Sequence, residues 1–141
     1  MKYLNQGVPS NPTLEYAESI ILPADTTVIL SEGGGSTIDV GKWLARKYNL
    51  PHIVVPTTAG TGSEVTKYCV LTEKGKKVTY TDDKFIPTSY ILDPHLVTTC
   101  PREVTLSAGL DAMSQALEAM WSKNKTQHNA IAHIPNIMVF M

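Results

Sequence analysis

Three short segments of this chain carry residue types that could bind a ligand. Gly33-Gly34-Gly35-Ser36 is rich in glycine, Pro56–Glu64 consists mainly of small and hydroxyl residues, and Asp111 and Gln115 are oxygen donors four positions apart. Glycines let a phosphate approach the main chain, whereas carboxylate and amide oxygens suit a divalent cation. The three segments therefore predict an anion site and a candidate cation site.

The glycine segment lies between a predicted strand and a predicted helix, where free N–H groups and the helix dipole favour an anion. It does not match the dinucleotide fingerprint, because Ile38 stands where the third glycine belongs. It does not match a P-loop either, because five residues separate Gly35 from Gly41 and Trp43 replaces the hydroxyl residue. A tight turn with a capping box of Ser36 and Asp39 remains an equal alternative to phosphate binding.

The second segment follows a predicted buried strand and offers the hydroxyls of Thr57, Thr58, Thr61 and Ser63. The carboxyl ends of parallel strands are where such folds bind ligands, so we expect these hydroxyls to line a polar ligand. A surface loop is the alternative.

Asp111 and Gln115 share one face of a predicted helix and supply only half of a coordination sphere. On the local pattern alone a solvated helix face is favoured for this pair. The histidines have no spacing that completes a metal site: His52, His95, His128 and His133. Cys69 lies in a predicted strand and is interpreted as a small core residue.

Apolar, β-branched runs at 26–30 and 52–55 predict buried strands, and the helical pattern of 37–48 between them completes a βαβ unit with a parallel sheet. A helix is expected to start at Asn11-Pro12-Thr13. Segments 65–72 and 76–81 predict a β-hairpin around Glu73-Lys74-Gly75, and 90–92 a short strand. After Pro101 the pattern predicts one amphipathic helix. Its apolar face consists of Leu110, Met113, Leu117 and Met120. Its polar face consists of Asp111, Gln115, Glu118 and Ser122.

The composition of the 141 residues, 43% hydrophobic and 18% charged, predicts a packed globular domain. A formal charge of −1 argues against nucleic acid as a partner. No apolar run approaches the roughly 20 residues of a membrane span, and the first residues have no signal-peptide core. The two cysteines form no CxxC pair, so we expect a cytoplasmic protein.

Four blocks taken together resemble the iron-containing (group III) alcohol dehydrogenase family. They occur in order between Val8 and Ser122, and they are 33-GGGSTID-39, 56-PTTAGTGSEVT-66, 91-ILDP-94 and 109-GLDA-112. The resemblance implies an α/β fold, a Rossmann-like parallel sheet with a β-hairpin, followed by the first helices of an all-α metal-binding domain. It implies a partial NAD(P)-binding domain over 1–100 and the start of a truncated helical domain over 101–141.

The resemblance also implies roles for individual residues. Gly34, Gly35 and Ser36 would cradle the NAD(P) pyrophosphate, and Asp39 would lie at the base of the cofactor pocket. Further cofactor contacts would be Thr57, Thr58, Thr61, Ser63, Thr66, Val70 and Lys77. Asp111 would be the first ligand of a divalent metal, Fe or Zn, and Gln115 takes the position of a ligand histidine. No catalytic side chain is assigned, because the metal polarises the substrate oxygen and the nicotinamide transfers the hydride.

The implied reaction is hydride transfer between NAD(P) and a primary alcohol or aldehyde, in a family expected to form homo-oligomers. Gln115 and its neighbours look most like a branch of phosphonoacetaldehyde reductases. Two further ligand histidines and the first strands of the family have no counterpart here, so the chain is interpreted as truncated at both ends and inactive alone. The alternative is a nucleotide-binding remnant or a non-catalytic gene fragment.

Overall fold

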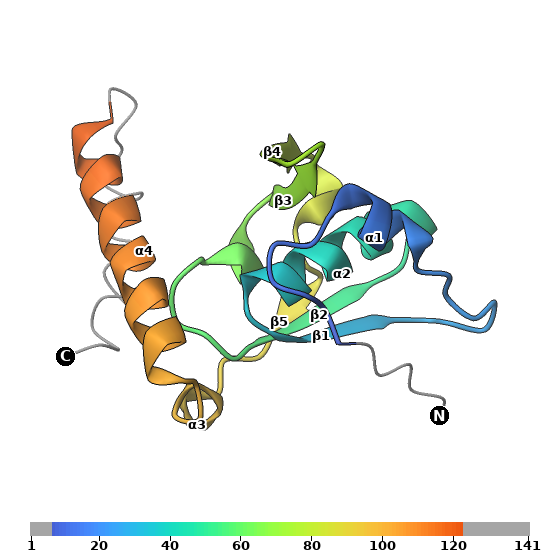
Figure 1. The fold of residues 1–141 in the computed structure, drawn as a ribbon. Coiled ribbons are helices and arrows are strands. Elements are labelled where there is room, and N and C mark those ends of the chain that lie inside the picture. Colours follow the sequence, from blue (N-terminus) through green and yellow to red (C-terminus); the bar gives the residue numbers. More distant parts are fainter. Residues whose placement is uncertain (1–6, 123–141) are drawn as a thin grey trace.

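The computed structural model describes residues 7–122. An α/β part comes first, and a long helix, α4 (Arg102–Trp121), stands beside it (Figure 1). His128 and His133 lie outside the described residues. None of the described helices is both long and apolar enough to cross a membrane.

The α/β part is built on a parallel βαβ unit, as the sequence predicts. Strand β1 (Ile29–Gly33) leads into α2 (Gly35–Tyr48), which returns the chain to β2 (His52–Pro56). These strands pair in parallel, and the short β5 (Ser89–Tyr90) adds to the far side of β2, giving the order β1-β2-β5. The carboxyl ends of β1 and β2 therefore reach the same edge of the sheet.

Strand β1 begins later than the apolar run predicts. Both the main-chain N–H and the hydroxyl of Thr26 donate to the carbonyl oxygen of Pro23, at 3.0 and 2.7 Å. That turn excludes the first residues of the run from the sheet and moves the strand to 29–33. β5 is likewise shorter than the predicted strand at 90–92.

The capping-box alternative at the start of α2 is wrong. The helix begins at Gly35, and its N-cap residue, Gly34, provides no side-chain hydrogen bond. Ser36 therefore lies within the first turn, where its hydroxyl accepts from the main-chain N–H of Asn11 at 3.3 Å. Both carboxylate oxygens of Asp39 accept from residues outside the helix.

The predicted hairpin is confirmed as β3 (Tyr68–Glu73) and β4 (Lys76–Thr81), paired antiparallel. Lys74 and Gly75 both have positive φ angles, 50° and 76°, which a two-residue hairpin turn of this type requires. Cys69 is fully buried, as predicted, and burial raises the pKa of its thiol to about 12. The hairpin thereby closes one side of the hydrophobic core.

Helix α1 (Leu14–Ser19) starts at the predicted place, with Thr13 as its N-cap, and packs against α2 and β3. The core between these elements contains Ala17, Val40, Leu44 and Leu71. Two 3₁₀ turns, η1 (Ser63–Val65) and η2 (Asp83–Phe85), lie in the connections.

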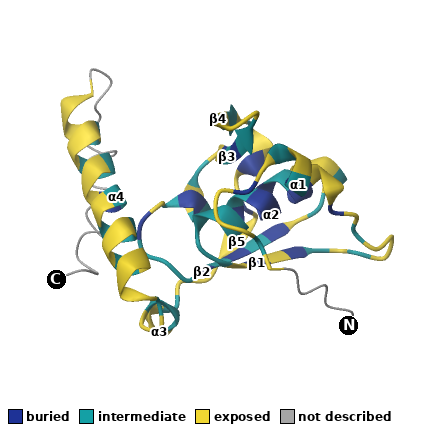
Figure 2. Ribbon diagram, in the orientation of Figure 1, coloured by how far each residue is buried: buried dark blue, intermediate teal, exposed yellow. Residues whose placement is uncertain are grey.

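Helix α4 is largely exposed, as Figure 2 shows, and follows the short helix α3 (Pro94–Val97). Its only buried residue is Ala112. Its apolar face is open among the described residues, because the exposed fractions are 66% at Leu110, 51% at Met113, 43% at Leu117 and 58% at Met120. A domain boundary near residue 100 stays a prediction.

Candidate functional site

The glycine turn (Gly33–Ser36) and the threonine loop (Thr57–Thr61) meet at the carboxyl ends of β1 and β2. The N–H of Thr57 donates to the carbonyl oxygen of Gly33 at 3.0 Å. A Cβ on Gly34 would lie 3.2 Å from Cγ2 of Thr58, and one on Gly35 would lie 2.9 Å from Cγ2 of Thr61. Glycine is needed here because the two segments approach so closely.

The glycine turn opens onto the N-terminus of α2. The first N–H groups of a helix have no acceptor within it, and the helix dipole adds partial positive charge at this end. Gly33 has a φ of 157°, and a Cβ there would lie 2.6 Å from Oγ1 of Thr37. Because Gly33, Gly34 and Gly35 have no side chains, a phosphate group can approach the main chain at this end of α2.

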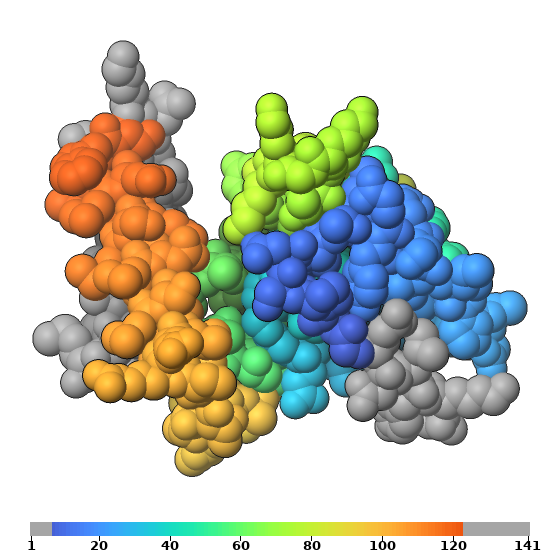
Figure 3. Space-filling model, viewed as in Figure 1, coloured from blue at the N-terminus to red at the C-terminus, as the bar shows by residue number. Residues whose placement is uncertain are grey.

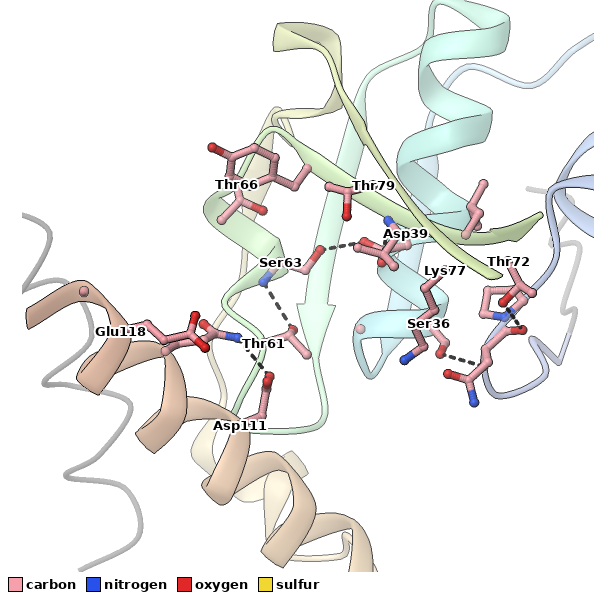
Figure 4. Close-up of a pocket in the computed structure, with 18 of the residues that line it drawn as sticks. Ser36, Asp39, Thr61, Ser63, Thr66, Thr72, Lys77, Thr79, Asp111 and Glu118 are labelled. Carbon is pink, nitrogen blue, oxygen red and sulfur yellow. Dashed lines mark hydrogen bonds between the residues drawn. The ribbon is translucent and has the colours of Figure 1, made fainter. Parts of the chain in front are cut away.

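A cavity of about 870 Å³ extends from the glycine turn between the β3–β4 hairpin and α4, visible as a hollow in Figure 3. It is large enough for a cofactor-sized ligand. Most of the predicted site residues line it, namely Gly35, Ser36, Asp39, Thr61, Ser63, Thr66, Val70, Lys77, Asp111 and Gln115 (Figure 4). The topology therefore brings together residues from α2, η1, the hairpin and α4.

The remaining three predicted residues lie to one side of this cavity. Gly34 faces Thr58, and Thr58 lines a second, smaller cavity of about 200 Å³. That second cavity is formed with residues of α3 and α4, including Val97, Thr105 and Ala108. Thr57 lines neither cavity, and its main chain holds the two segments together.

The threonine loop also contacts the backbone of α4. A Cβ on Gly60 would lie 2.6 Å from the carbonyl oxygen of Ala108 and 2.8 Å from its Cβ. This close approach fixes where α4 stands relative to the sheet edge. The polar face of α4 consequently forms one wall of the larger cavity.

Asp39 lines the larger cavity and is partly buried. Burial raises the pKa of its carboxyl, while hydrogen bonds from the Ser63 hydroxyl at 2.9 Å and the Val70 N–H at 3.1 Å oppose that rise. The hydroxyl hydrogen of Ser63 is therefore donated to Asp39.

Lys42, one turn further along α2, is fully buried, and the sequence reasoning missed it. Burial lowers the pKa of its ammonium group, and the charge of Asp39 opposes that effect. The signal was present in the sequence, since Lys42 follows Ile38 by four positions and so shares the buried face of the helix. A charged residue on a buried face indicates a specific set of partners.

Asp111 and Gln115 do lie side by side on α4, where the amide nitrogen of Gln115 donates to Oδ2 of Asp111 at 2.9 Å. Within residues 7–122, no group of three or more His, Cys, Asp or Glu side chains is arranged to hold a metal ion. His52 is 3% exposed and its Nε2 lies 2.9 Å from the Ser31 hydroxyl beneath α2, away from this pair. Two oxygen donors do not make a metal centre, so the described residues do not fit a resident metal by themselves.

Comparisons with known proteins agree with this architecture. Residues 3–94 match the family described as iron-containing alcohol dehydrogenase. A maleylacetate reductase of Sphingobium indicum is 37% identical over 110 residues, which is 78% of this chain and 31% of the relative.

Solved structures give the same relationship. The iron-containing alcohol dehydrogenase of Thermococcus thioreducens superposes with a TM-score of 0.84 at 29% identity, over 95% of this chain and 43% of that one. The sulfoacetaldehyde reductase of Bifidobacterium kashiwanohense, solved with NAD⁺, gives a TM-score of 0.76 at 31% identity, over 94% of this chain and 46% of that one. The chain thus spans less than half the length of these relatives. Because the match includes the glycine turn, the threonine loop and the hairpin, the chain belongs to the iron-containing alcohol dehydrogenase family.

Proposed function

We propose that this chain binds NAD(P)(H), with the diphosphate on the main chain of Gly34, Gly35 and Ser36. The observation that carries the proposal is the close approach of Gly34 and Gly35 to Thr58 and Thr61 at the half-buried N-terminus of α2. This arrangement offers N–H groups, hydroxyls and a helix dipole to one anionic group. The adjoining cavity of about 870 Å³ supplies room for the rest of the ligand.

The cofactor would lie with its nicotinamide end in the larger cavity. Asp111 and Gln115, the proposed cation donors, line that cavity, and Lys77 is in its wall. The adenosine end would then extend past Thr58 into the smaller cavity of about 200 Å³. Asp39 would lie at the base of the pocket, and the remaining contacts would be Thr57, Thr61, Ser63, Thr66 and Val70.

The reaction proposed for the whole protein is hydride transfer between the nicotinamide and a small primary alcohol or aldehyde. The cofactor supplies the hydride acceptor or donor, and the residues of this chain bind and orient it. Gln115 in place of a ligand histidine supports phosphonoacetaldehyde as the substrate. Within residues 7–122, Asp111 and Gln115 are the two proposed oxygen donors for a metal, and no larger group of ligands is arranged there. We therefore propose that the chain by itself binds cofactor without turnover.

The binding proposal is tested by titrating NADH and NADPH into the purified chain and recording the heat of binding. The wild type is expected to bind at or below millimolar concentration. Gly35→Ala places a methyl group 2.9 Å from Thr61 and is expected to weaken binding at least tenfold. Gly7→Ala is the matched control, because nothing lies within 4 Å of a Cβ there. A folded wild type with no signal at millimolar cofactor would contradict the proposal.

The absence of turnover is tested separately. Elemental analysis of the purified chain is expected to find less than one metal ion per chain. Assays with NADH and phosphonoacetaldehyde or a simple aldehyde, with added Fe²⁺ or Zn²⁺, are expected to show no turnover. Stoichiometric metal with turnover would show that the chain is a complete enzyme rather than a nucleotide-binding remnant.

A further inference from the structure

Lys42 holds the backbone of a segment that forms one side of the larger cavity. Its ammonium nitrogen lies 2.9 Å from the carbonyl oxygen of Thr66, 3.2 Å from the Thr66 hydroxyl and 2.7 Å from the carbonyl oxygen of Tyr68. An ammonium group has three N–H donors, so these acceptors use all of its donors. Lys42 is fully buried and has no donor left for a ligand.

Asp39 holds the same segment from one turn earlier on α2. Its two carboxylate oxygens accept from the Ser63 hydroxyl and from the Val70 N–H. Residues three apart on a helix lie on one face, so Asp39 and Lys42 can both bond to the same neighbouring segment. Together they bond to residues 63, 66, 68 and 70, and we define residues 63–70 as the clamped segment.

The clamped segment supplies side chains to the proposed cofactor site. Ser63, Thr66 and Val70 all line the larger cavity, as Figure 4 shows for the first two. The glycine turn is continuous with the N-terminus of the same helix. The first turn of α2 thus carries the proposed diphosphate site, and its second and third turns bond to the clamped segment through Asp39 and Lys42.

We propose that Asp39 and Lys42 are positioning residues, which hold the clamped segment at a fixed place relative to the glycine turn so that the cofactor site is formed before the cofactor arrives. This inference rests on the proposed function. A preformed site binds more tightly because no loop has to be ordered on binding.

The test compares two variants of the full chain, Lys42→Met and Ser31→Ala. Methionine keeps most of the lysine stem and removes the three hydrogen bonds. Ser31→Ala removes a buried hydrogen bond to His52 on the sheet side of α2, and so lowers stability without touching the clamped segment. Both are measured at a temperature where each is fully folded by circular dichroism.

Two readouts are expected to separate them. The dissociation constant for NADH rises at least tenfold in Lys42→Met and stays within twofold of wild type in Ser31→Ala. Amide hydrogen exchange at residues 63–70 rises at least tenfold in Lys42→Met, while the amides of β1 and β2 are unchanged. Asp39→Ala, which removes both acceptors of the clamped segment, is expected to give the same exchange pattern and serves if Lys42→Met does not fold.

The exchange and binding results test the clamp and the cofactor proposal separately. Exchange that rises only in the clamped segment, in a protein whose wild type does not bind NADH, supports the clamp and contradicts the cofactor proposal. Unchanged exchange in the clamped segment overturns the clamp, whatever the wild type binds. A rise spread evenly over the whole chain, as in Ser31→Ala, also overturns it, because the two residues would then contribute only to general stability.

Discussion

Helix α4 is richer in apolar residues than α2, yet α2 is the helix that is enclosed. α2 is enclosed by the sheet, α1 and the hairpin, and Leu44 on it is 6% exposed. The polar face of α4 lines the larger cavity, and Leu110 on this helix is 66% exposed. A helical pattern thus specifies which residues share a face of a helix, but it does not specify which face packs against another element.

The two helices also differ in the hydrogen-bond partners of their charged side chains. On α2 a lysine is fully buried and uses all of its donors inside the protein. On α4 the Asp111 carboxylate and the Gln115 amide bond to each other at the cavity wall. The first arrangement gives rigidity, whereas the second leaves oxygen donors beside a ligand-sized space.

The largest expected effect comes from the same substitution in each helix. Leu44→Ala removes a core side chain and is expected to lower the free energy of unfolding by about 2–5 kcal/mol. Leu110→Ala removes an exposed side chain and is expected to change it by less than about 0.5 kcal/mol. Urea unfolding followed by circular dichroism measures both. Equal losses would show that the apolar face of α4 is covered in solution, and the contrast between the helices would disappear.

The second prediction concerns the pH dependence of stability that results from the burial of His52 next to α2. Burial, and secondarily the charge of Lys42, lower the pKa of His52 to about 4, against an ordinary value of 6.5. The unfolded chain therefore binds more protons than the folded chain between these values, so stability contributed by neutral His52 is lost as pH falls from about 6.5 to 4. The loss approaches about 3 kcal/mol at the acid end.

His52→Gln, which retains a polar group opposite Ser31 but cannot titrate, is the control for that effect. The raised pKa of Asp39 has the opposite sign and is common to both proteins, so the difference between them isolates His52. Thermal melts between pH 4 and 7 are expected to show a smaller acid-induced decrease in Tm for the variant. Parallel curves would mean that His52 is accessible to protons in the folded state.

The smallest effect concerns α4 itself. Gln115→Ala removes the hydrogen bond to Asp111 and is expected to change the free energy of unfolding by no more than about 0.5 kcal/mol, the usual contribution of such an i,i+4 pair. Ser114→Ala, which alters a bond to the Asp111 carbonyl oxygen, provides a comparison on the same turn. A loss above 1.5 kcal/mol would indicate that this pair supports tertiary packing.

The sequence was sufficient to predict the βαβ unit and the hairpin, because both have strong local signals. The β-branched runs specify buried strands, and Lys74-Gly75 suits a tight two-residue turn. It was insufficient for the exact start of β1, because the Thr26–Pro23 hydrogen bonds that exclude residue 26 from the sheet compete with strand propensity.

The candidate site was predictable where main chain and small residues dominate. Glycine and threonine segments at strand ends point to one edge of a sheet, and the structure places them in contact. Lys42 was not predictable as a partner of Thr66 and Tyr68, because those contacts join residues more than 20 positions apart. The role of Ser36 in bonding to Asn11 is non-local for the same reason.

The contact between Gly60 and Ala108 has a mechanical consequence. Because the nearest atoms of Ala108 include its carbonyl oxygen, no change of rotamer can relieve pressure on this contact. A side chain at position 60 would therefore require the backbone of α4 or of the threonine loop to move. The close packing of α4 against the threonine loop therefore depends on glycine at position 60.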